Sequence, residues 1–196
     1  MKPLNAAFAA LVLTLPAACA TPVGPVEVTR FHVPDTAPLG AGTITVEPMA
    51  GGDPASLEFR SYAAAVGQEL ARLGYRQVGA SSNQVALLSV ERAVFQPGRQ
   101  RSPVSVGVGG STGSYGSGVG LGIGLDLSGP PPEQVETRMW VQIRDRSTDE
   151  TLWEGRASFD VKASSPLAQT QLGAAKMAQA LFRDFPGTSG ETILVE

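Results

Sequence analysis

The chain has 196 residues, of which 42% are hydrophobic, enough for one domain of ordinary size with its own core. Its formal net charge is -3, whereas a nucleic-acid-binding protein needs clustered excess Lys and Arg, so that class is excluded. It contains one Cys and one His, which excludes a metal site built from several Cys and His ligands.

The first segment has the three parts of an export signal. Lys2 is followed by an uncharged apolar run, Leu4–Leu15, and then by small residues up to Cys19. The apolar run is too short for a permanent membrane-spanning helix. We therefore expect residues 1–18 to be a signal peptide that is removed on export.

Cys19 decides how this signal is processed. Small residues directly before a single Cys resemble the lipobox of bacterial lipoproteins, in which the Cys becomes the first mature residue and carries acyl chains such as palmitate. Pro16 stands where that motif usually has Leu, so cleavage after Ala20 without acylation is the alternative. Each buried acyl methylene contributes about 0.8 kcal/mol, so several chains would fix residues 19–25 to a membrane as a lipidated tether. The absence of Asp after the Cys resembles lipoproteins sorted to the outer membrane, which predicts a domain that faces the periplasm.

The first half of the exported chain predicts several strands and one helix. Asp53 can cap a helix whose apolar residues recur at helical spacing, and Gly74 supplies its left-handed stop. The elements expected here are, in order, a strand at 26–33, a short strand at 43–47, a helix at 54–73, a short strand at 75–78 and a central strand at 85–95.

A glycine-rich segment, residues 97–132, follows and is called the insert below. It has no charged residue between Arg101 and Asp126, and Val, Leu and Ile alternate with Gly and Ser in two runs. The pattern predicts a hairpin with one aliphatic and one bare face. It needs a partner surface, because glycine weakens a strand by about 0.5–1 kcal/mol per residue. Three interpretations stay open: packing on the parent domain, docking or self-association by strand addition, and insertion into the outer membrane by an oligomer. The length of the first run argues against membrane insertion, because a membrane-spanning strand needs roughly 9–11 residues and this run is shorter.

The clearest pattern lies in residues 133–162. Odd positions are mostly apolar and even positions mostly polar in 135–143, and the alternation resumes in 153–161 after the polar turn 145–150. We therefore predict an antiparallel hairpin with one buried and one solvent-exposed face. Trp140 falls on the polar face, where we expect neighbouring side-chain stems to cover it.

The C-terminal part predicts a second helix and a last strand. Ser165 and Pro166 begin an amphipathic helix, which ends before Pro186, and 192–195 is a candidate edge strand. Together these elements predict an α+β fold, in which a mainly antiparallel sheet of four to five strands carries two helices on one face and the insert adds a glycine-rich hairpin. Residues 26–196 form this single periplasmic domain.

No catalytic residue, cofactor site or metal site is predicted. His32 is the single His, and no second group completes a catalytic set with it, so we interpret it as an ordinary strand residue. Asp145, Ser147 and Asp149 have the spacing of a calcium loop, but the central glycine and the closing bidentate acid are missing. We interpret these three residues as a turn.

Several short motifs resemble one protein family when they are taken in order. They are the sequence LARLGY at residues 70–75, Leu152-Trp153-Glu154-Gly155 on the hairpin, and Phe185-Pro186 after the second helix. Their order, over roughly Val26 to Pro186, resembles the bacterial lipoproteins that carry domain of unknown function 4136. This resemblance implies no catalytic residue, because that family is uncharacterised.

The sequence thus predicts a cell-envelope lipoprotein of unknown molecular role, anchored by its N-terminal lipid at the periplasmic face of the outer membrane. We expect its domain to bind another envelope protein or peptidoglycan without catalysis, and not to bind nucleic acid. The alternative is a self-assembling structural or pore-forming lipoprotein that uses the insert to form an oligomer. The sequence does not name the ligand or the partner.

Overall fold

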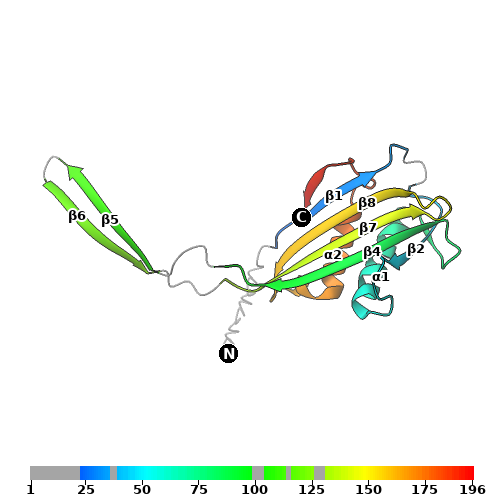
Figure 1. Cartoon of the computed structure of the whole chain (residues 1–196), viewed down its shortest axis with the longest axis horizontal. Coiled ribbons are helices and arrows are strands. Elements are labelled where there is room, and N and C mark those ends of the chain that lie inside the picture. Colours follow the sequence, from blue (N-terminus) through cyan, green and yellow to red (C-terminus); the bar gives the residue numbers. More distant parts are fainter. Residues whose placement is uncertain (1–22, 36–38, 99–103, 114–115, 126–130) are drawn as a thin grey trace, which may run out of the picture.

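A computed structural model describes residues 23–35, 39–98, 104–113, 116–125 and 131–196. The strands are β1 (Val26–His32), β2 (Thr43–Pro48), β3 (Arg76–Gln77), β4 (Gln84–Phe95), β5 (Val104–Gly113), β6 (Gly116–Leu125), β7 (Gln134–Asp145), β8 (Thr151–Lys162) and β9 (Thr192–Val195). The helices are α1 (Leu57–Arg72) and α2 (Thr170–Phe182), preceded by a short 3-10 helix, η1 (Pro166–Ala168). Figure 1 shows the main sheet with α1 and α2, and β5 and β6 drawn apart from it.

The main sheet corrects the predicted fold class. It has seven strands in the order β3-β2-β4-β7-β8-β1-β9 and is mixed, so the expectation of four to five mainly antiparallel strands was wrong. β2 pairs in parallel with both β3 and β4, because α1 crosses over between them and returns the chain in the same direction. The outermost strands β3 and β9 match the short strands expected at 75–78 and 192–195, but with only two and four residues they were left out of the predicted strand count.

The hairpin of β7 and β8 is confirmed. Its antiparallel register pairs Gln134 with Lys162 at one end and Arg144 with Thr151 at the other, with an irregularity beside Ile143. Alternate residues of both strands are buried, as the sequence pattern predicted. The two strands lie at the centre of the sheet, so their buried face meets both helices.

Both predicted helices form, but each begins later than expected. The N-cap of α1 is Ser56, whose hydroxyl accepts a hydrogen bond from the backbone N–H of Phe59 at 3.4 Å; the predicted cap, Asp53, instead accepts from Ala55 at 2.8 Å in the preceding turn. Ser165 caps only η1, and α2 begins separately at Thr170. The stop at Gly74 is confirmed, because its φ is +107° and a Cβ there would lie 2.6 Å from the carbonyl oxygen of Gly40.

The core lies between the two helices and one face of the sheet. Its largest fully buried side chain is Trp153, whose ring centroid is 5.3 Å from those of Phe182 and Phe185. The Trp153 indole N–H donates to the carbonyl oxygen of Pro186 at 3.0 Å. Two of the short motifs that are distant in the sequence, at residues 152–155 and 185–186, therefore meet in one cluster.

The insert contains the predicted hairpin. β5 and β6 pair antiparallel with each other in a separate two-stranded sheet. Its register places aliphatic residues opposite each other, such as Val106 opposite Ile123 and Val108 opposite Leu121. Each strand has ten residues, so the expectation that the first run is too short to span a membrane was wrong.

Candidate functional site: the open face of the sheet

The face of the main sheet opposite α1 and α2 carries the polar side chains of the alternating strands, and we call it the open face. The register aligns four of its strands side by side, in the order β4, β7, β8 and β1. Its side chains are mostly exposed or half-buried, whereas those of the other face form the core. Within the described residues, both helices pack on the core face, so the open face is a broad surface available to another molecule.

A shallow groove of about 460 Å³ crosses these four strands. It extends from Glu27 on β1 to Glu91 on β4, and Arg156 and Trp140 line its middle part. Small side chains form much of its floor, among them Ser89 next to Trp140. The groove lies where the small side chains of Ser89, Thr29 and Ser158 stand beside larger ones on the neighbouring strands.

Trp140 is the large aromatic side chain of this groove. The guanidinium carbon of Arg156 lies 4.9 Å from the centre of the Trp140 ring, a cation–π contact. The prediction that a neighbouring side chain covers Trp140 is thereby confirmed for Arg156. The residue is still 37% exposed, so it can also contact a bound molecule.

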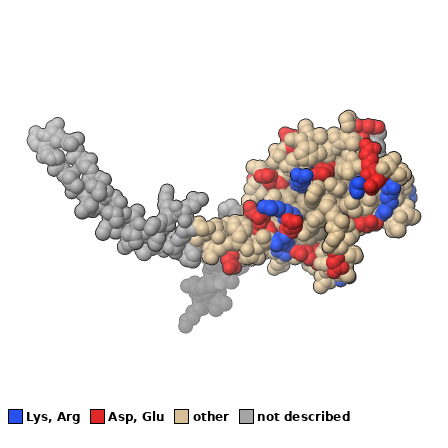
Figure 2. Space-filling model, viewed as in Figure 1, with Lys and Arg blue, Asp and Glu red and all other residues tan. Residues whose placement is uncertain are grey.

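Both arginines that line the groove are already paired with acids of their own strand. Arg156 binds Glu154, with Nη2 at 2.7 Å and Nε at 2.9 Å from Oε1, and Glu154 also accepts from Gln142 at 3.1 Å. Arg138 binds Glu136 at 2.5 Å. Figure 2 shows the same interspersion of acidic and basic side chains over the face in view.

Acidic groups crowd one end of the open face. Asp160 lies opposite Glu136 in the register of β7 and β8. Partial burial raises the pKa of the Asp160 carboxyl, and the negative charges of Glu136 and Glu27 raise it further, while Arg138 acts in the opposite direction. Glu136 is paired with Arg138, so the carboxylates at this end without an ion pair among the described residues are those of Glu27 and Asp160.

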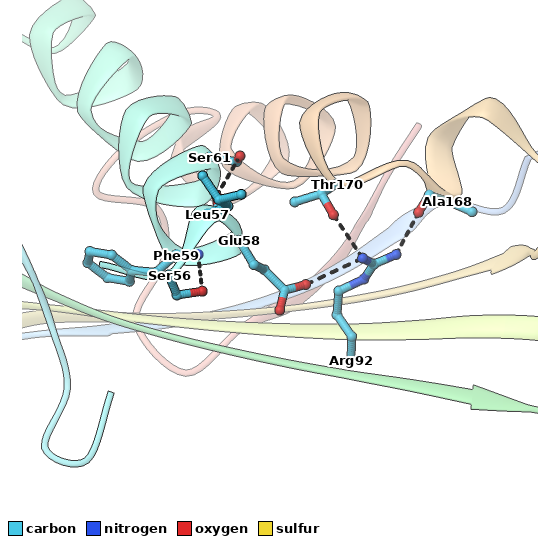
Figure 3. A network of polar contacts seen from close by, with 8 residues as sticks. All are labelled: Ser56, Leu57, Glu58, Phe59, Ser61, Arg92, Ala168 and Thr170. Atoms are coloured by element: carbon cyan, nitrogen blue, oxygen red, sulfur yellow. Dashed lines mark hydrogen bonds and ion pairs between the residues drawn. The ribbon is translucent and has the colours of Figure 1, made fainter. Parts of the chain in front are cut away.

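The core face contains a polar network around Arg92, the residue that interrupts the apolar pattern of β4. Its Nη1 donates to Thr170 Oγ1 at 2.9 Å and contacts Glu58 at 3.3 Å, and its Nη2 donates to the carbonyl oxygen of Ala168 at 2.5 Å. Figure 3 shows that these partners come from the first turns of α1 and from the η1–α2 segment. Arg92 thus ties β4 to both helices, which is a structural role.

A buried arginine, Arg30, lies at the end of α2. Arg30 is 4% exposed, and its guanidinium donates to the carbonyl oxygens of Leu181 and Ala180 in the last turn of α2, at 2.9 and 3.0 Å. Carbonyl oxygens at a helix end lack the usual N–H partners, although that of Ala180 also accepts from the backbone N–H of Arg183 at 3.4 Å. Burial lowers the pKa of Arg30, while the charges of Asp184 and Glu191 act in the opposite direction. Arg30 therefore acts as a helix cap from inside the sheet.

His32 and the β7–β8 turn occupy ordinary structural positions. The ring nitrogens of His32 lie 2.8 Å from the Val33 carbonyl oxygen and 3.2 Å from that of Gly187, and the residue is a half-buried strand residue as predicted. Asp145 Oδ1 accepts from the N–H and hydroxyl of Ser147 at 2.7 and 2.6 Å and from the N–H of Thr148 at 3.1 Å. These bonds lower the pKa of Asp145, and they confirm the turn. Across the described ranges, no three or more His, Cys, Asp or Glu side chains are grouped to hold a metal ion.

The predicted lipid attachment residue, Cys19, and the signal peptide at 1–18 lie outside the described residues. In the part of the chain that is described, no helix is both long and apolar enough to cross a membrane.

A comparison with protein families settles the kinship of the chain. Residues 41–187 match the family described as Domain of unknown function (DUF4136). The chain belongs to this family. The resemblance to this domain, inferred from the short motifs, is confirmed, although the match begins between β1 and β2 rather than at Val26. The match does not test whether the chain is a lipoprotein.

Relatives of this DUF4136 chain add little about its activity. An uncharacterised protein of Zymomonas mobilis subsp. mobilis is 37% identical over 59 residues, which is 30% of this chain and 22% of that protein. The chain thus matches about a fifth of that relative's length.

Two solved structures are distantly similar to the DUF4136 chain. A PDZ domain protein from Parabacteroides distasonis has a TM-score of 0.47 at 11% identity, over 88% of this chain and 39% of that one. A PelC dodecamer from Paraburkholderia phytofirmans has a TM-score of 0.40 at 14% identity, over 80% of this chain and 96% of that one. Scores of this size support no argument about the function of this chain.

Sequence reasoning did not find the groove of this DUF4136 domain. It identified the polar face of β7 and β8, but the neighbours of that face, β1 and β4, are set by strand order and register. Glu27 and Glu91 are 64 positions apart in the sequence and reach the same groove only through the pairing of β1 with β8 and of β4 with β7. The single signal available was a Trp among charged residues at position 140.

Proposed function

We propose that this member of the DUF4136 family is a lipid-anchored protein of the cell envelope, whose α+β domain binds a partner on the open face of its sheet without catalysing a reaction. The observation that supports the binding role is the groove across β1, β8, β7 and β4, with the partly exposed Trp140 inside it. An exposed aromatic side chain in a concave surface is a typical anchor for a bound macromolecule.

The proposed absence of catalysis is supported by four polar groups that are engaged within the fold. Arg30 and His32 face backbone carbonyl oxygens, Arg92 joins β4 to the helices, and Arg156 binds Glu154. A general base or nucleophile needs a free reactive atom that faces substrate. The groups named here instead hold this chain's own structure together.

The proposed anchor depends on Cys19 and is tested by the mass of the mature N-terminus. We expect a chain that begins at Cys19 and carries acyl groups, and a Cys19→Ser variant that is not acylated and leaves the membrane fraction. A mature chain that begins at Thr21 without acyl groups would remove the anchor. The binding role would then be tested on a soluble protein.

The proposed binding face is tested by photo-crosslinking in cells. A photoreactive phenylalanine analogue placed at Ser158, inside the groove, is compared with the same analogue at Ser61 on α1. Both serines are half-buried, so the two positions are matched in exposure. We expect discrete crosslinked products from position 158 and few from position 61. Equal products from both positions, or products from position 61 alone, would contradict the proposed face.

The insert supports a second candidate function, self-assembly. β5 and β6 form a sheet of two strands, so the outer edge of each strand has no partner among the described residues, and an open edge can accept a strand of another copy. Their length of ten residues also meets the requirement for a membrane-spanning strand. Deletion of residues 103–128 tests this candidate by sizing the purified mature protein with and without the insert. An oligomer that becomes a monomer on deletion favours self-assembly, and a monomer in both forms removes it.

A further inference from the structure

We propose that the partner of the open face is a basic segment of protein chain in extended conformation, which lies across the strands with one cationic side chain at Glu27 and another at Glu91. This inference rests on the proposed function, because it names the chemistry of the partner that the groove would bind. It is argued from the register of four strands, the charge of the groove and the exposure of Trp140.

The register places the two acids in one row. Glu27 on β1 lies opposite Ser158 on β8, Ser158 lies opposite Arg138 on β7, and Arg138 lies opposite Glu91 on β4. Neighbouring strands are about 4.8 Å apart, so three steps separate Glu27 from Glu91 by about 14 Å. An extended chain rises about 3.3 Å per residue, so residues i and i+4 of a bound segment span nearly the same distance.

The charge of the groove is that of these two acids. Arg138 and Arg156, which also line it, are neutralised by Glu136 and Glu154 on their own strands. No ion pair of Glu27 or Glu91 is found among the described residues. The rim therefore keeps two separated negative charges, which fit two positive charges of a partner.

Between the two acids the row itself consists of Ser158 and Arg138, and the apolar contact is offered beside it, by Trp140. Residues i, i+2 and i+4 of an extended segment point to the same side, so residue i+2 would face the sheet between the two cations. Trp140 lies on β7 two residues beyond Arg138, on the same face. Its exposed part can pack against an aliphatic side chain at i+2.

The crowding of acids beside the row supports the same partner. Burial is the main cause of the raised pKa of Asp160, and the charges of Glu136 and Glu27 raise it further while Arg138 lowers it, so the carboxylates of Glu27 and Asp160 repel each other. A bound cation would reduce this repulsion. An anionic partner would increase it.

Peptide titrations of the full mature chain test the inference. The probe is acetyl-Lys-Ser-Leu-Ser-Lys-amide, compared with an isomer in which the two lysines are adjacent and with an analogue that has Glu in place of both lysines. Binding is followed by the NMR signal of the Trp140 indole N–H, which is distinguished from that of Trp153 by a Trp140→Phe variant. We expect the spaced basic peptide to shift this signal, the isomer to bind more weakly, and the acidic analogue not to bind.

Variants of the two acids supply the controls. Glu27→Gln and Glu91→Gln should each weaken binding of the spaced basic peptide about two- to fivefold, which is the range for an exposed ion pair. Glu150→Gln, in the exposed β7–β8 loop, should leave binding of this peptide unchanged. Equal binding of the acidic analogue, no binding of the basic peptide, or unchanged binding in both groove variants would overturn the inference. If crosslinks from position 158 persist in any of these cases, the open face still binds a partner and only its basic character is wrong.

Discussion

The substitution Gly155→Ala tests how tightly the core is packed around Trp153. A Cβ at position 155 would overlap Cη2 of Trp153 and would lie 2.8 Å from Cδ1 of Leu181. Trp153 has no free space to move into, because it is fully buried, lies against Phe182 and donates its indole N–H to Pro186. The methyl group therefore has to displace the ring or the helix that covers it.

The magnitude follows from three contributions. Overpacking of a well-packed core costs about 1–3 kcal/mol. Displacing the ring far enough to break the indole hydrogen bond leaves a buried polar group unsatisfied, at about 1–3 kcal/mol. Alanine in a strand recovers about 0.5–1 kcal/mol relative to glycine. We expect a net loss of about 3 kcal/mol in the free energy of unfolding, which lowers the Tm of a chain of this size by about 6–12 °C.

The assay is urea and thermal unfolding of the mature chain, followed by near-UV circular dichroism. Gly79→Ala is the matched control, because its new Cβ would meet nothing within 4 Å. A Trp153→Phe background removes the atoms that the methyl would overlap, so a double-mutant cycle should show a favourable coupling of at least about 1 kcal/mol. If Gly155→Ala is as stable as Gly79→Ala, the packing around Trp153 is not as described.

Three further substitutions test the polar groups. Arg30→Met should lower the free energy of unfolding by about 2 kcal/mol, because two hydrogen bonds from a charged donor are lost. Removal of a buried charge offsets only part of that loss. The control, Arg60→Met at an exposed position, should change the free energy of unfolding by less than about 0.5 kcal/mol. Arg92→Met should cost about 1–2 kcal/mol in the same urea assay, because the contacts of β4 with both helices are removed, and no change would refute its role. Folding raises the pKa of Asp160, so the native state keeps this proton to a higher pH than the unfolded state does. Above the folded-state pKa the ionised carboxylate therefore destabilises the fold. The effect disappears as the pH falls below both the folded-state and the unfolded-state pKa. Asp160→Asn should therefore raise the urea midpoint at about pH 7 and leave it unchanged at about pH 3, and an equal gain at both would contradict this reasoning.

The sequence predicted the elements of this fold better than their arrangement. The alternation in β7 and β8 and the glycine stop of α1 are local signals, and both are confirmed. The parallel pairing of β2 was missed, although the order strand, helix, strand implies a crossover connection. The start of α1 was misplaced by three residues because Asp53 and Ser56 are both good caps; the structure uses Ser56, and Asp53 bonds Ala55 in the preceding turn.

The candidate site could be predicted only in part for a similar reason. Trp140 on a polar strand face was visible in the sequence, and so were Arg30 and Arg92 as charged residues on otherwise apolar faces. Their partners were not, because each partner is distant in the sequence: Arg30 binds carbonyl oxygens 150 and 151 residues away. Family membership adds no activity, since the family itself is described only as a domain of unknown function.

The most direct test of the central claim, that the open face is occupied by a partner in the cell envelope, is the accessibility of that face. The chain has one natural Cys, so a single thiol introduced by Ser158→Cys in the groove or by Ser61→Cys on α1 is readily followed with a maleimide. We predict that the thiol at position 158 reacts more slowly in isolated envelopes than in the purified protein, while the thiol at position 61 reacts equally in both. Equal rates at position 158 in the two preparations would contradict the account.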